Sequence, residues 1–325
     1  VDYGYSKTID EAYRSWDRER VLEDLVRIIR VNRPLVVVSR FHGSTRDGHG
    51  HHQAAGDLAI EAAQAAGDPN RFPQQLSTGL RPWSALRVFR GGVREGEPTD
   101  VTIDATEYAP ELGQTYQALA SYGLSLQRSQ TSGRVRVGGG AYRYELVTGE
   151  LVPSGNADSF FEGFDTSLAG LPELLGEPVS DLALDLLANA DLALATANTN
   201  AAQNAEFATT ALIAALAALN RTLAEPGLSP GSGSEVGRVL ETKRLQIERA
   251  LAHAVGLDFT ATTTQPNEVS PTRVAPGDQF GVEVNAAVHA APPASLVRST
   301  EVALEAPTGW LVDRIPGEPQ RFTVT

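Results

Sequence analysis

One short apolar run and the polar loop after it constrain the fold more than any other part of this sequence. Residues 35–39 read LVVVS, and Pro34 before them disfavours a helix there. Because the run is apolar and largely β-branched, it predicts a strand buried on both faces of a parallel sheet. Helical patterns lie on both sides of the run and its loop. The order helix, strand, loop, helix predicts an α/β, Rossmann-like layer.

The flanking segments carry helix signals of their own. Thr8 and Glu11 have capping-box spacing at the start of a helical pattern over 8–30, and Asp17 is placed to cap a second segment inside it. Helix formers continue over 52–66. The sequence predicts further strands at 87–89 and 101–103 and a helix at 111–127.

The pattern changes along the chain and predicts three domains. Residues 1–150 form the α/β part. Residues 151–257 are helical, with an alanine-rich stretch at 180–224 and a last helix at 235–254. From 258 to 325, Val, Thr and Phe alternate between Pro and Gly turns, which predicts the start of an Ig-like β-sandwich.

Composition excludes several classes of function. Asp and Glu number 40 against 27 Lys and Arg, and the net charge of −13 disfavours nucleic acid as a partner. There is no cysteine, so disulfides, thiolate metal sites and a cysteine nucleophile are excluded. No apolar run reaches the roughly 18 residues of a membrane span. Any metal must be held by histidine and carboxylate.

Histidines gather in the loop after the predicted strand. Four of the six, His42, His49, His51 and His52, lie between positions 42 and 52. His49 and His52 are three residues apart at the start of a helix, so both rings can face one site. Neutral imidazole suits zinc, and a catalytic zinc normally has three protein ligands and a water. The alternative is a solvated loop without a ligand.

Other residues near the loop leave two interpretations open. Arg46 precedes Asp-Gly, and it fits a contact to a sugar hydroxyl or phosphate as well as a salt bridge within the loop. Trp83 and Phe72 fit either the wall of a sugar pocket or the core, where an aromatic beside proline usually packs. His253 and His289 have no polar companions in the sequence, which predicts surface or core-edge positions.

The sequence resembles a known family, the PIG-L/LmbE metal-dependent N-acetylglucosaminyl deacetylases. It is most similar in organisation to the large bacterial members, which also have helical and sandwich regions. The resemblance is carried by DYGYSKTIDEAYRSWDRERVLEDLVRIIRVNRPLVVVSRF and RDGHGHHQAAGDLAIEAAQAAGDPNRFPQQLSTGLRPW. It continues through LGQTYQALASYGLSLQRSQTSG and SFFEGFDTSLAGL, and more loosely beyond. The motif G-H-x-x-H between RDG and QAAG is its most specific part.

The resemblance implies roles for individual residues. It makes His52 a zinc ligand and places His49 beside the substrate carbonyl, where it helps to stabilise the oxyanion. Zinc would supply a nucleophilic water and an electrophile. Asp47 fits a position that orients one of these imidazoles, or one that only caps the following turn.

Two departures from the family pattern limit what this chain is expected to do. Family members carry H-P-D-D-E after their first strand, with the other two zinc ligands and the aspartate general base, and this sequence has no H-P-D-D-E. We expect the chain to begin after that motif, and a decayed deacetylase is the less economical alternative. Gln127 stands where relatives often have His.

The sequence therefore predicts part of a zinc-dependent hydrolase that removes the acetyl group from an N-acetyl amino sugar or glycoconjugate. We expect the chain alone to bind zinc weakly and to turn over little or nothing. The missing cysteine, the acidic charge and the appended sandwich favour a secreted or periplasmic location. The alternative is a non-catalytic carbohydrate-binding or interaction protein that uses the sandwich. The sequence carries no signal for the oligomeric state.

Overall fold

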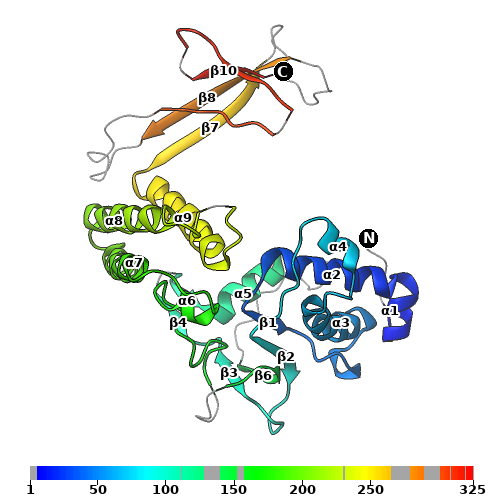
Figure 1. The fold of residues 1–325 in the computed structure, drawn as a ribbon. Helices are drawn as coiled ribbons and strands as arrows, with labels where there is room; N and C mark the ends of the chain where they lie inside the picture. The colour runs from blue at the N-terminus through cyan, green and yellow to red at the C-terminus, as the bar shows by residue number, and fades with distance from the viewer. Residues whose placement is uncertain are drawn as a thin grey trace. The chain divides into compact units, whose positions relative to one another are not determined.

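The computed structural model describes residues 6–110, 112–127, 140–151, 157–229, 231–264, 279–288, 301–307, 309–318 and 320–324. The chain divides into two compact units, Val1–Phe164 and Asp165–Thr325. The first unit is mixed α/β, and the second holds a helical part and an antiparallel sheet (Figure 1). The predicted sequence of fold classes is thus confirmed.

Helices and strands alternate along the first unit. Its elements are α1 (Ile9–Ser15), α2 (Arg18–Asn32), β1 (Val36–Ser39), the 3-10 turn η1 (Thr45–Asp47), α3 (Gly50–Gly67), α4 (Pro73–Ser77), β2 (Arg87–Val93), β3 (Val101–Asp104), β4 (Tyr108–Ala109), β5 (Gln114–Thr115), α5 (Tyr116–Ser125) and β6 (Ala141–Thr148).

The predicted caps start the first two helices. The Thr8 hydroxyl accepts a hydrogen bond from the Glu11 amide at 3.2 Å. The Asp17 carboxylate accepts one from the Arg20 amide at 3.2 Å, so the pattern over 8–30 is two helices that meet at Asp17. The helix predicted over 111–127 is shorter, because Thr115 caps it at the Ala118 amide and a small hairpin precedes it.

The sheet of the first unit has the order β1-β2-β6-β3. Strand β1 runs parallel to β2, with Val36 opposite Arg87 and Ser39 opposite Arg90. Strand β6 is antiparallel to both β2 and β3. Helices α2 and α3 cover one face of β1 and β2 (Figure 1), and Val37 and Val88 pack against them.

The prediction that β1 is buried on both faces is wrong. Within the described residues β1 lies at the edge of the sheet, and Val38 is 39% exposed. Val36 packs with Phe89 on the face away from the helices, and the ring of Phe160 contacts that of Phe89 there. A strand with only one neighbouring strand leaves part of its surface exposed to solvent. The apolar composition of the run could not predict this edge position.

A buried arginine ties α2 to the end of α3. The side chain of Arg30 is fully buried, and its guanidinium donates only to uncharged acceptors. These are the main-chain carbonyls of Ala65, Ala66, Asp68, Arg71 and Phe72 and the side-chain oxygen of Gln75, at 2.8 to 3.4 Å. Ala65 and Ala66 lie in the last turn of α3, where the carbonyls lack partners within the helix and a cation is favoured.

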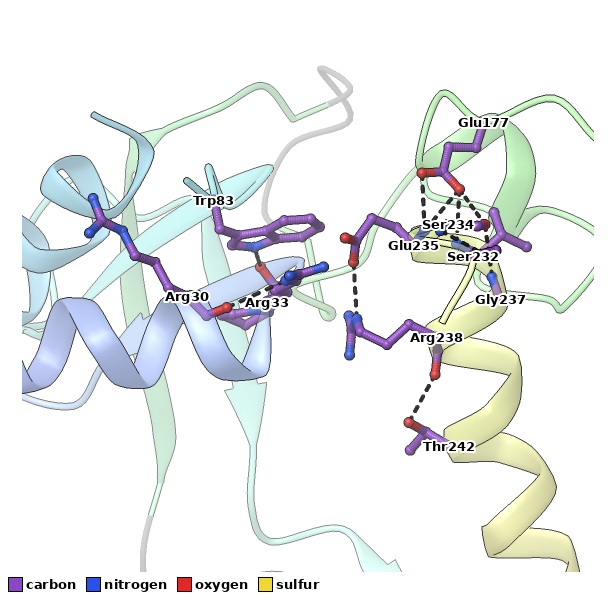
Figure 2. A network of polar contacts seen from close by, with 12 residues as sticks. Arg30, Arg33, Trp83, Glu177, Ser232, Ser234, Glu235, Gly237, Arg238 and Thr242 are labelled. Atoms are coloured by element: carbon purple, nitrogen blue, oxygen red, sulfur yellow. Dashed lines mark hydrogen bonds and ion pairs between the residues drawn. The ribbon is translucent and has the colours of Figure 1, made fainter. Parts of the chain in front are cut away.

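Next to Arg30, side-chain donors close the turn between α2 and β1 (Figure 2). Arg33 is in the left-handed conformation that ends α2, and its Nε donates to the Arg30 carbonyl at 3.4 Å. The indole of Trp83 donates to the Pro34 carbonyl at 2.7 Å. Trp83 and Phe72 both pack against the core of this unit, so the core interpretation of these aromatics holds.

The second unit begins with helices and ends with strands. Its elements are α6 (Leu171–Leu174), α7 (Asp181–Asn200), α8 (Ala205–Leu223), α9 (Glu235–Ala254), β7 (Leu257–Thr264), β8 (Phe280–Val288), β9 (Val312–Arg314) and β10 (Arg321–Val324). The helical stretch predicted over 180–224 is two helices. The described strands form one antiparallel sheet, in the order β7-β8-β10-β9.

A carboxylate from outside α9 caps that helix. Glu177 accepts hydrogen bonds from the Ser234 hydroxyl at 2.7 Å and from the amides of Glu235 and Val236 (Figure 2). The Ser234 hydroxyl in turn accepts from the Gly237 amide. This arrangement places negative charge at the positive end of the helix, and it fixes the start of α9 at the predicted residue.

We predict that Arg30→Met destabilises the α/β unit. The change leaves the Arg71 carbonyl and the Gln75 side-chain oxygen without their donor and removes one of two donors from the other carbonyls, so the free energy of unfolding is expected to fall by about 3–5 kcal/mol. Urea unfolding followed by tryptophan fluorescence checks this, because Trp16 and Trp83 both lie in this unit. The control is Arg27→Met on the exposed surface of α2, expected to change stability by less than about 0.5 kcal/mol. Equal effects of the two changes would contradict the role of Arg30.

Candidate histidine site

The histidine loop leaves the carboxyl end of β1 and enters α3. Residues 40–44 extend from the strand, η1 makes a single turn, and His49 is the N-cap of α3. The helix packs closely against the loop at two glycines, because a Cβ on Gly56 would lie 2.3 Å from the Gly43 amide nitrogen. Only a residue without a side chain allows this approach, so the glycines fix where the loop crosses the helix.

The carboxylate of Asp47 organises the loop. It accepts hydrogen bonds from the amides of His42 at 3.1 Å, Gly43 at 2.7 Å and Ser44 at 3.1 Å. Hydrogen bonds to an ionised acceptor are stronger than neutral ones. The Asp47 side chain thus holds the residues that precede it, and in these contacts it neither caps the following turn nor orients an imidazole directly.

The main-chain carbonyl of Asp47 holds His52 instead. Its oxygen lies 3.1 Å from Nδ1 of His52. A carbonyl can only accept, so Nδ1 carries the proton and the neutral ring leaves a lone pair on Nε2. The ring also stacks on Phe41, with centroids 4.1 Å apart and planes 12° apart. Both its rotation and its tautomer are fixed.

His49 lies on the other face of the same ring. The centroids of His49 and His52 are 4.0 Å apart, and the planes differ by 28°. His51 meets His49 edge-on, and their Nδ1 atoms are 3.3 Å apart. Ser6 holds His51 from the N-terminal segment, at 2.9 Å from Nδ1 and 3.1 Å from the backbone amide. The structure thus brings three of the four loop histidines into one cluster.

Burial and neighbouring imidazoles set the charge of His49. Its pKa is lowered below the ordinary histidine value by burial, with smaller contributions from the rings of His52 and His51. His49 is therefore neutral near pH 7, and one ring nitrogen can donate a hydrogen bond without a full positive charge.

The cluster fits one ligand of a zinc site rather than a whole site. Nε2 of His52 has the tautomer that a metal needs. A zinc ion lies about 2.0–2.1 Å from each ligating nitrogen in the plane of its ring. The stacked rings of His49 and His52 share no such plane, so both cannot ligate one ion. Over the described ranges, no three His, Asp or Glu residues are placed to hold a metal.

Arg46 belongs to the loop scaffold. Its guanidinium forms an ion pair with Glu97 at 2.6 Å and lies 3.4 Å from the Gly92 carbonyl. Arg46 thus forms a salt bridge, but with a residue between β2 and β3 and not within the histidine loop as expected. His253 is exposed on α9, as expected, whereas His289 lies outside the described residues.

His42 lines a pocket whose walls include none of the other loop histidines. A pocket of about 450 Å³ is lined by residues of the loop, α3 and β2, among them His42 and Arg90. Two buried side-chain atoms in the described part of the chain have no hydrogen-bond partner, and they are Nδ1 of His42 and Nε of Arg90. Sequence reasoning did not single out Arg90, whose strand contacts the loop only in the folded chain.

Comparison with protein-family models, curated proteins and solved structures gives no match to this chain. Among the described helices, none combines the length and the apolar character needed to cross a membrane. The function must therefore be argued from the site itself.

We predict that Asp47→Asn loosens the loop and His52 together. An amide presents one acceptor oxygen and an N–H₂ group to three amide donors, so the expected loss is about 2–4 kcal/mol in the free energy of unfolding. In ¹⁵N NMR spectra, His52 should change from a single Nδ1–H tautomer to a mixture. The control is Asp24→Asn at an exposed position of α2, which should leave the free energy of unfolding and the His52 tautomer unchanged. An unaltered tautomer in Asp47→Asn would contradict the coupling.

We predict a pH dependence of stability from His42. Burial first, and then the positive charges of Arg46 and Arg90, lower the pKa of His42, and the carboxylates of Asp47 and Glu145 oppose this. The unfolded chain binds this proton at about pH 6.5. The contribution of neutral His42 to the free energy of unfolding is therefore fully present above that pH, and it is lost as the pH falls below it. The free energy of unfolding should drop more between about pH 7 and pH 5 in the wild type than in His42→Gln.

The matched control for this measurement is His253→Gln, which changes an exposed histidine of the other unit. Its pH profile should follow that of the wild type. Parallel profiles for the wild type and His42→Gln would show that His42 does not contribute.

Proposed function

We propose that this chain carries the histidine half of the active site of a zinc-dependent hydrolase that removes the acetyl group from an N-acetyl amino sugar or related conjugate. The observation that carries the proposal is the hydrogen bond from Nδ1 of His52 to the Asp47 carbonyl. It leaves Nε2 as the free ligand atom, at the carboxyl end of a strand where α/β sheets bind ligands.

His52 has the environment of a metal ligand. The ring is held on one face by Phe41 and on the other by His49, and Nε2 is not among the buried unpartnered atoms of the described residues. A fixed and accessible lone pair needs little reorganisation on binding. When bound, zinc supplies a nucleophilic water and polarises the acetyl carbonyl.

His49 is placed to meet negative charge on the acetyl oxygen. It is the N-cap of α3, where the helix dipole is positive, and its lowered pKa keeps the ring neutral near pH 7. A neutral imidazole donates one hydrogen bond to the developing oxyanion, and it does so without repelling an adjacent cation.

The remaining parts of such a site are expected from the resemblance. The H-P-D-D-E motif of the family would supply two more ligands and the acidic general base, and the present sequence does not contain it. The chain on its own is therefore expected to bind zinc weakly and to turn over little or no substrate.

We predict that His52→Ala abolishes the weak zinc binding of this chain. The change removes the ligand atom but leaves the loop contacts of Asp47 in place. Binding is measured by competition with a chromophoric zinc chelator. The control His253→Ala, in the other unit, should bind zinc as the wild type does.

Two results would count against the proposal. Zinc binding that survives in His52→Ala would show that the ion is held elsewhere. Efficient deacetylation of N-acetylglucosamine conjugates by this chain with added zinc would show that the site is not half a site.

The alternative function, a carbohydrate-binding or interaction protein that uses the C-terminal sheet, predicts a different outcome. Glycan binding by that sheet would be unaffected by His52→Ala, since β7 to β10 belong to the other unit. A glycan array probed with the wild type and this variant separates the two functions.

A further inference from the structure

A second pocket adjoins the histidine cluster. It has a volume of about 290 Å³, close to the lower end of the range of about 300–1,000 Å³ for small-molecule sites. Its walls come from the loop, the end of β2 and the start of β6. The lining residues are Arg40, Phe41, Asp47, Gly92, Val93, Ala141, Tyr142, Arg143 and Tyr144.

The pocket shares residues with the site of His52. Phe41 lines the pocket, and its ring stacks on His52. Asp47 also lines it, and its carbonyl holds Nδ1 of the same histidine. A molecule bound in this pocket would therefore lie beside the residues that hold the His52 ring, so the pocket is a neighbouring subsite of the histidine cluster.

Two arginines give this pocket positive charge that the described protein does not neutralise. The side chains of Arg40 and Arg143 form no hydrogen bond or ion pair with a described residue, and the Arg40 guanidinium lies over the Phe41 ring, 5.6 Å from its centroid. By contrast, the nearby Arg46 and Arg90 are each paired with a glutamate.

The carboxylate in the wall does not supply the missing partner. Asp47 already accepts hydrogen bonds from three amides of its own loop. The positive charge of Arg40 also acts on the pocket wall, because it favours the ionised form of Tyr144 against the dominant effect of burial, which raises the pKa of that tyrosine. In a chain of net charge −13, the positive charge of this pocket is a local exception, and it favours the binding of an anionic group.

We propose that the substrate carries an anionic group, a phosphate or a carboxylate, which Arg40 and Arg143 bind while the N-acetyl group lies at the histidines. Guanidinium binds either group through paired N–H donors. The aromatic side chains of Tyr142 and Phe41 provide apolar surface for the sugar between the two ends. This assignment rests on the proposed function, because it treats the pocket as part of the deacetylase site.

The test compares three N-acetyl sugars by isothermal titration calorimetry with the whole chain. N-Acetylglucosamine 1-phosphate presents a phosphate, N-acetylmuramic acid presents a carboxylate, and N-acetylglucosamine has no charge. We expect at least one anionic sugar to bind about tenfold more tightly than the neutral one. The tighter of the two identifies the source of the anion. The difference should shrink at high salt.

Substitutions assign the binding to the two arginines. Arg40→Gln and Arg143→Gln should each weaken binding of the anionic sugar about tenfold and leave the neutral sugar unchanged. Arg143→Lys should weaken it less, because the charge is kept while the planar pair of donors is lost. The control Arg27→Gln, on α2 and outside the pocket, should bind as the wild type does. Circular dichroism shows that each variant is folded.

The outcomes separate this proposal from the function on which it rests. Equal binding of charged and neutral sugars, absence of binding, or an equal effect of Arg27→Gln would overturn the anion site. His52→Ala should keep the preference for anionic sugars while it loses zinc. If the arginines bind the anion but the wild type binds no zinc, the deacetylase function fails and the anion site stands.

Discussion

The buried guanidinium of Arg30 is the interaction on which the rest of the α/β unit depends. It satisfies carbonyls at the C-terminus of α3 and in the turn that follows, and it joins both to α2. Helix α3 has 18 residues and is about 27 Å long, so this anchor and the histidines lie near opposite ends of one rigid rod. A clamp at one end of the helix therefore sets the direction of the other end.

At that other end, main-chain groups position the functional side chains. The Asp47 side chain collects three amides of the loop, and this places its own carbonyl against His52. Asp47 therefore orients the imidazole of His52 through its main-chain carbonyl and not through its carboxylate. Gly43 and Gly56 let the loop approach α3 closely enough for this geometry. The tautomer of His52 is a consequence of loop folding as much as of the histidine itself.

Features that depend on neighbouring residues in the sequence could be predicted, and those that depend on distant ones could not. The caps Thr8 and Asp17 and the bounds of α9 follow from patterns a few residues long. Thr115 offered a similar signal for the start of α5, three residues before the amide that it caps, and it was missed. The exposure of Val38 depends on which strands lie beside β1, and local sequence does not encode that.

The same limit applies to the site. The density of histidines predicts the cluster, because residues 49–52 lie within one turn of a helix. The choice between a side-chain and a main-chain partner for His52 depends on how the loop closes. The convergence of Arg40 and Arg143 joins segments about a hundred positions apart in the chain, and it becomes visible only in the folded unit.

The strand order has a consequence for how the protein is made. Strand β3 pairs only with β6 within this sheet, although it precedes β6 in the chain. During synthesis, β3 thus has no strand to pair with until residues 141–148 have been added. Helices α2 and α3 form from local contacts and meet much earlier, whereas the sheet must close long loops. Helices α2 and α3 can therefore pack on β1 and β2 while β3 is still unpaired, and the far edge of the sheet is the last part of this unit to form.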